Sequence, residues 1–134
     1  MKTKPVLTHE DVKKIAAAAE AEALKNQWAV TISIVDDGGH LLWLQRLDGA
    51  APVSAWISPQ KAITAALGRR ESAVYEKMVN EGRMSFLSVT PVTPLEGGVP
   101  IIVDGHYVGA VGVSGVKSTE DVQIAKAGIA ALGL

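Results

Sequence analysis

The chain contains no cysteine among its 134 residues. This absence excludes disulfide bonds, thiolate nucleophiles and cysteine-ligated zinc, and it is typical of a reducing compartment, so we expect a cytoplasmic protein. An excess of charge of one sign is also lacking, because 13 basic residues stand against 14 acidic ones. The net charge of −1 predicts neither a nucleic-acid partner nor binding to an anionic membrane surface.

Long apolar runs are absent as well. No segment approaches the roughly 18 apolar residues that a membrane-spanning helix needs, and residues 1–5 lack the apolar core of a signal peptide. The composition that remains is ordinary for a globular protein, with 48% hydrophobic residues. We therefore expect one domain, covering residues 1–134, with a hydrophobic core of its own.

Helical and extended patterns alternate in the first third of the chain. A helix is predicted to begin at Thr8, with Asp11 in the position of a capping-box acid. Its buried face should consist of Val12, Ile15, Ala16, Ala19 and Ala23. Trp28–Val35 and Leu41–Leu47 then predict two strands joined by a turn. The first strand has one apolar and one mixed face, and the second carries apolar residues on both, so helices or another subunit should cover both faces of the sheet.

Cap and turn signals organise the middle of the chain. Ser58-Pro59 resembles an N-cap followed by proline at the first helical position, which predicts a helix that continues to Arg70. Ser72–Glu81 predicts a shorter helix. Residues 84–89 fit either a strand or an irregular crossing, and prolines and glycines predict a loop over Thr90–Val99.

A glycine-rich hairpin dominates the C-terminal third. Apolar runs on both sides of Asp104-Gly105 predict two strands, and glycine recurs in the second strand at 109, 112 and 115. This recurrence indicates close approach of another backbone, a helix or a ligand. Ser118 with Asp121 should open a final helix. Because short turns join consecutive strands, the expected fold class is α/β of the α+β type, with a largely antiparallel sheet.

Histidine is the first candidate for ligand chemistry. None of His9, His40 and His106 has the spacing of a zinc site. His40 and His106 flank predicted hairpin turns and are expected at the surface. His9 lies in the first turn of the first helix, where two interpretations stay open: a solvated helix-end residue or an axial ligand of haem iron.

The second candidate is a polar set made of Arg46, Asp48, Lys61, Thr64 and Ser114. Arg46 and Lys61 suit a ligand carboxylate, such as a haem propionate or a small organic acid. The alternative is an ion pair of Asp48 with either cation. Ser114 has no recognisable general base, which argues against a serine hydrolase.

Gly97 and Gly98 are the third candidate, together with the glycines of residues 109–115. They match no phosphate-binding loop. They form either a pocket wall of backbone amides for a flat or anionic ligand, or a surface that packs tightly against alanine-rich helices. The residues alone leave both interpretations open.

Several segments together resemble the GlcG/HbpS-like family, in order and over residues 7–134. They are Val35–Leu41, Arg46–Ala50, Lys61–Ala65, Gly97–Ile101, Gly109–Gly115, and Asp121 with Ala125 and Gly128. The resemblance implies a profilin-like fold, an antiparallel sheet of about five strands flanked by helices. It also implies haem binding, through a helical histidine near the N-terminus such as His9, and assembly of dimers into octamers.

Three hypotheses follow for the function. The leading one is a protein that binds a small molecule, a haem or another tetrapyrrole, without independent catalysis. The second is an oligomeric accessory protein of a metabolic operon that holds no prosthetic group. The third is an enzyme that acts on a small organic acid or degrades haem.

Overall fold

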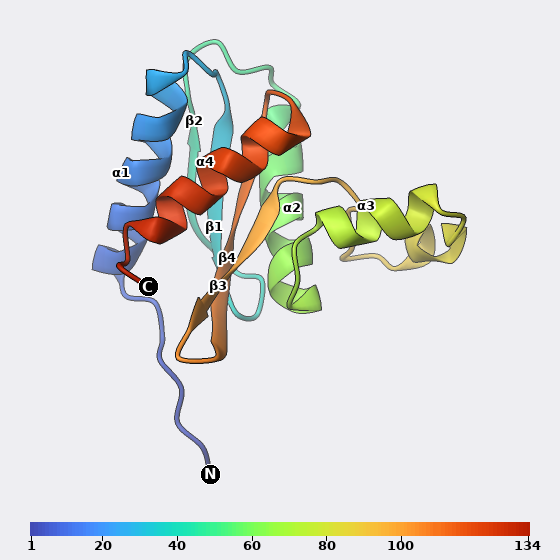
Figure 1. Ribbon diagram of the computed structural model, residues 1–134, viewed down its shortest axis with the longest axis horizontal. Helices are drawn as coiled ribbons and strands as arrows, with labels where there is room; N and C mark the ends of the chain where they lie inside the picture. Colours follow the sequence, from blue (N-terminus) through green and yellow to red (C-terminus); the bar gives the residue numbers. More distant parts are fainter.

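The computed structural model describes residues 1–134 and places all four strands in one sheet. The elements are α1 (His9–Lys25), β1 (Thr31–Asp36), β2 (Leu41–Arg46), α2 (Ser54–Gly68), α3 (Ala73–Asn80), the 3-10 helix η1 (Met84–Ser88), β3 (Gly98–Val103), β4 (His106–Ser114) and α4 (Ser118–Ala130). Every pairing is antiparallel, in the order β2-β1-β4-β3 (Figure 1). The two hairpins therefore meet at their centre through β1 and β4. This architecture confirms the α+β class and the antiparallel sheet.

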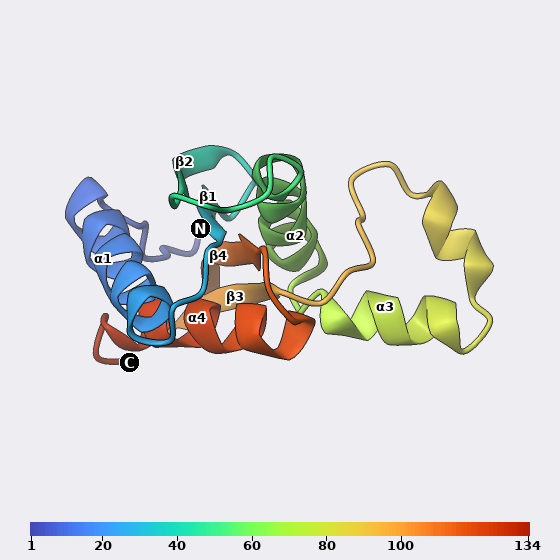
Figure 2. The same cartoon turned by 90° about the horizontal axis from the view of Figure 1, so that it is seen from above.

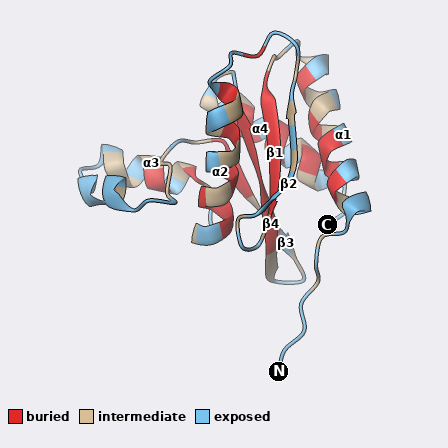
Figure 3. Ribbon diagram, turned by 180° about the vertical axis from the view of Figure 1, so that it is seen from behind, coloured by how far each residue is buried: buried red, intermediate tan, exposed pale blue.

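Helices cover both faces of the sheet, with α1 and α4 on one face and α2 on the other (Figure 2). Strand β1 shows why both are needed. Ile32 and Ile34 enter the larger core with α1 and α4, whereas Val35 joins the alanines of α2 in a second cluster. Figure 3 shows the resulting band of buried residues along β1 and β4. The expectation that both faces are covered is confirmed at the centre of the sheet.

Helix α1 begins as its local signals predict. The Thr8 hydroxyl accepts a hydrogen bond from the Asp11 N–H at 3.2 Å, and the Asp11 carboxylate accepts one from the Thr8 N–H at 2.9 Å. The Thr8 hydroxyl also donates to this carboxylate at 2.9 Å, and the hydrogen bonds from the Thr8 N–H and then from the Thr8 hydroxyl lower the pKa of Asp11. All five residues predicted for the buried face are buried.

The sheet has four strands, so the expectation of about five is wrong by one. Residues 84–88 form η1, and the loop that follows pairs with no strand before Gly98. Phe86 packs against Tyr75 of α3, with ring centroids 5.4 Å apart. Contact with α3 therefore holds this segment away from the sheet edge. Helix α3 and η1 project from the body as an arm, residues 72–89 (Figures 1 and 2).

One predicted helix start and one predicted helix cap are wrong. Helix α2 begins at Ser54 rather than at Ser58, and Pro59 lies inside it, where its missing N–H removes one helical hydrogen bond. Helix α4 begins at Ser118 as predicted, but Lys117 and Glu120 form its cap, whereas Asp121 turns inward to Lys61. In both helices, contacts with residues distant in sequence override the local cap pattern, because Ser58 bonds to Gly112 and Asp121 bonds to Lys61. No helix has both the length and the apolar character needed to cross a membrane.

Candidate functional site

Helix α2 lies directly on the glycines of the sheet. A Cβ atom added at Gly112 would overlap the Ser58 carbonyl oxygen and lie 2.5 Å from the Ala62 nitrogen. A Cβ at Gly98 would overlap the Lys61 carbonyl. The backbone of α2 thus fills the space beside these two glycines. This agrees with the interpretation that they pack against a helix, and not with a pocket wall at this position.

Small hydroxyl side chains connect α2 to β1 across this contact. The hydroxyls of Thr31 and Ser54 lie 2.7 Å apart. The Ser58 hydroxyl lies 2.7 Å from that of Ser33 and donates to the Gly112 carbonyl at 2.8 Å. All four residues are buried, and no buried polar side-chain atom lacks a partner. We call these four hydroxyl residues the hydroxyl seam, and the sequence analysis did not predict it. The pattern that could have indicated it is hydroxyl residues at alternate positions of a strand and four positions apart on a helix.

Lys61 and Asp121 form a buried ion pair between α2 and α4. The Lys61 Nζ atom lies 3.0 Å from Asp121 Oδ2 and donates to the Val113 carbonyl at 2.9 Å. Asp121 Oδ1 accepts the Val116 N–H at 3.2 Å. The two residues are 4% and 2% exposed. Burial raises the pKa of Asp121 and outweighs the opposing effect of Lys61.

Thr64 holds the loop that leads into β3. Its hydroxyl donates to the Gln60 carbonyl at 2.8 Å and accepts the Thr93 N–H at 2.8 Å. Ser72 has the same function at the base of the arm, where its hydroxyl donates to the Leu95 carbonyl and accepts the Gly98 N–H. Ser72 was not among the predicted site residues.

The remaining members of the polar set do not meet. The Arg46 guanidinium donates twice to the Ala50 carbonyl, at 3.1 and 2.9 Å. Asp48 is exposed and pairs with neither Arg46 nor Lys61, so the alternative ion pair is not formed. Ser114 is buried at the end of β4, opposite Thr31. As ligand contacts, these residues and the two glycines Gly97 and Gly98 stay predictions.

His9 is exposed at the first position of α1, and its ring makes no hydrogen bond or ion pair. Leu7 and Asp11, two residues before and after His9, line a groove of about 150 Å³ at the start of α1. Most of its lining is apolar: Pro5, Val6, Leu7, Val103, Val108, Leu132 and Leu134, with Asp11 as the charged member. His40, by contrast, lies 3.1 Å from Asp36. No group of three or more His, Cys, Asp or Glu residues is placed to hold a metal ion.

Comparison with known proteins matches the chain to one family. The family model described as "Haem degrading protein HbpS-like" matches residues 7–130. Protein GlcG of Escherichia coli K12 is 56% identical over 114 residues, which is 85% of either chain.

Two crystal structures resemble the fold closely. A double mutant of Streptomyces reticuli HbpS superposes with a TM-score of 0.91 at 31% identity, covering 100% of this chain and 92% of that one. A PduOC–haem complex superposes with a TM-score of 0.86 at 30% identity, covering 95% of both chains.

Proposed function

Since the chain belongs to the HbpS-like family, we propose that it is a single-domain cytoplasmic protein that binds a haem-type tetrapyrrole without independent catalysis. The PduOC relative is a haem complex and shares the fold over 95% of this chain. The lack of cysteine supports the cytoplasmic location. Within this chain, the proposal depends on one observation: the exposed imidazole of His9 has no hydrogen-bond partner, and Leu7 and Asp11, two residues before and after it, line an apolar groove.

The geometry at His9 suits a surface-bound haem. Neutral imidazole is a common axial ligand of haem iron, and no internal hydrogen bond competes for this ring. The groove is too small to enclose a porphyrin, so we propose that it receives one apolar edge of the macrocycle. The propionates then point to solvent, away from Asp11.

Adding haemin to the purified protein should produce a sharp Soret band with a saturable titration. His9→Ala should shift the band and weaken binding by about tenfold or more, because the axial ligand is lost. His40→Ala is the matched control, since His40 is exposed, lies against Asp36 at the β1–β2 turn and does not line the groove. A His9→Ala titration identical to that of the unmodified protein would contradict the assignment, and no saturable binding at all would reject the proposal.

The second hypothesis, an oligomeric accessory protein without a prosthetic group, is favoured by a different observation. One side of α2 and the neighbouring edge strand β2 carry exposed apolar side chains. We call this the α2–β2 face: Leu41, Leu42, Leu44, Val53, Trp56 and Leu67. Trp56 is 74% exposed. Such patches mark protein contacts, so we propose that the chain forms dimers through this face, which assemble into octamers.

Light scattering at micromolar concentration should report a multiple of the 14.0 kDa chain mass. Trp56→Glu should reduce that mass, because a carboxylate cannot be buried in an apolar contact. Val6→Glu is the matched control, since Val6 is 73% exposed but lies outside the α2–β2 face. A monomeric unmodified protein would contradict this assembly.

No observation favours the third hypothesis, an enzyme on a small organic acid or haem. The cations that it would use, Lys61 and Arg46, are engaged in internal bonds.

A further inference from the structure

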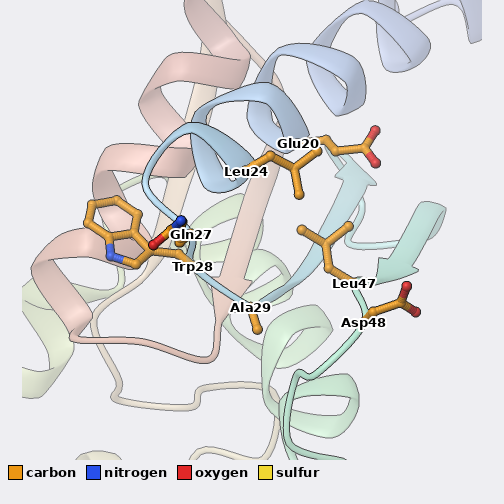
Figure 4. Close-up of a pocket in the computed structure, with 7 residues that line it drawn as sticks. All are labelled: Glu20, Leu24, Gln27, Trp28, Ala29, Leu47 and Asp48. Atoms are coloured by element: carbon orange, nitrogen blue, oxygen red, sulfur yellow. The ribbon is translucent and has the colours of Figure 1, made fainter.

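A second cavity, of about 450 Å³, lies between the last turns of α1 and the chain that leaves β2 (Figure 4). Its volume is in the range of small-molecule sites. Its apolar lining includes Leu24, Leu47 and Ala29, and its charged lining is limited to Glu20 and Asp48. In Figure 4 the two carboxylates lie on the same side of the cavity, with the two leucines between them.

The two carboxylates stand out from the other acids of the chain. Ten of the 14 acidic residues accept a hydrogen bond or pair with a cation within the chain. The four without such a partner are Glu20, Asp48, Glu76 and Asp104. Two of these four line this one cavity. The cavity thus combines two unneutralised negative charges with an apolar floor and contains no positive charge of its own.

From this combination we infer that the cavity binds a small organic cation, an amine or guanidinium carried on an apolar body. The charged group pairs with the carboxylates of Glu20 and Asp48. The body covers Leu24, which is 61% exposed, and Leu47. A haem propionate or another anion is disfavoured here because it would face two like charges. An uncharged apolar partner is disfavoured because it would bury both carboxylates without compensation.

The test uses the whole chain without added tetrapyrrole, so its outcome is independent of the haem proposal. The probes are 2-phenylethylamine, a cation at neutral pH, and 3-phenylpropionate, an anion of similar shape. Methyl NMR resonances of Leu24 and Leu47, assigned by single substitutions, should shift saturably with the amine and not with the carboxylate. Added salt should weaken the binding.

Neutralising variants identify the residues. Glu20→Gln and Asp48→Asn should each weaken amine binding by about threefold to fivefold, and the double variant should weaken it further. The matched control is Glu76→Gln with Asp104→Asn, the other two unpartnered acids, which lie outside the cavity. Equal shifts with both probes, no saturable shift, or unchanged binding in the double variant would each overturn the inference. A changed oligomer mass in the double variant would also overturn it, because a cationic side chain of a second copy would then be the occupant.

Discussion

Gly112→Ala should destabilise the protein by about 3 kcal/mol or more, and the chain should be largely unfolded or insoluble. The added Cβ would overlap the backbone of α2 at Ser58 and Ala62 rather than the end of a flexible side chain. Gly112 also lies in the centre of the sheet, opposite Ser33 and Gly98. Relief of the overlap therefore requires α2 to move off the sheet, which would break the buried hydroxyl seam.

Urea unfolding followed by circular dichroism measures this effect. Gly82→Ala is the control, because Gly82 has a positive φ of 105° and no atom near the added Cβ. Gly82→Ala should lower the unfolding free energy by only about 1–2 kcal/mol, because an alanine at positive φ strains the backbone. If Gly112→Ala were as stable as Gly82→Ala, the close contact between α2 and β4 would be wrong.

Lys61→Met should cost about 3–5 kcal/mol of unfolding free energy, because it leaves the buried Asp121 carboxylate without its cation. Lys61→Met combined with Asp121→Asn should be more stable than Lys61→Met alone. The asparagine amide carries no charge and keeps an oxygen for the Val116 N–H. A double-mutant cycle from urea unfolding measures the coupling of the pair. Additive effects of the two substitutions would contradict the ion pair.

The pH dependence of the same variant supplies a second measurement. Burial raises the pKa of Asp121 in the folded protein above its ordinary value of 3.8. Its contribution to stability is therefore fully present below pH 3.8, and it is lost as the pH rises through the folded-state pKa. Lys61→Met removes the main opposing influence, so the pKa of Asp121 should rise further. The loss of unfolding free energy caused by Lys61→Met should therefore be smaller near pH 4 than near pH 7. If this loss of unfolding free energy did not depend on pH, its cause would be lost packing and not the unpaired charge.

Local signals predicted the parts of the fold whose partners lie close in sequence. The capping box of Thr8 and Asp11 and the turn at Asp104-Gly105 each depend on residues at most a few positions apart. Asp104 and Gly105 both have positive φ, as a two-residue hairpin turn requires. Predictions from local signals were wrong where a residue far along the chain forms the hydrogen bond instead. The start of α2 is the example, because Ser58 bonds to Gly112 instead of capping the helix.

The same distinction between local and distant partners applies to the candidate site. The sequence analysis selected Lys61, Thr64 and Arg46 as candidate ligand contacts, but it could not identify the residues that they contact within the chain. Asp121 lies 60 residues from Lys61, and Ala50 offers Arg46 only a backbone carbonyl. Neither partner has a local signature. The cavity lined by Glu20 and Asp48 is equally invisible in the sequence, since it exists only where the end of α1 passes the exit of β2.

Periodicity, caps and turns act over a few residues, and they were enough to predict the fold class, the buried face of α1 and the glycine-rich hairpin. The family was recognised from the resemblance of several short motifs and is shown by the comparisons. The tertiary structure alone decided that four strands form the sheet, that α2 fills the space beside the glycines, and that Lys61 serves an internal ion pair. The physical reason is that burial and pairing energies depend on which distant segments meet. That choice is made by packing of the whole chain and not by any one segment.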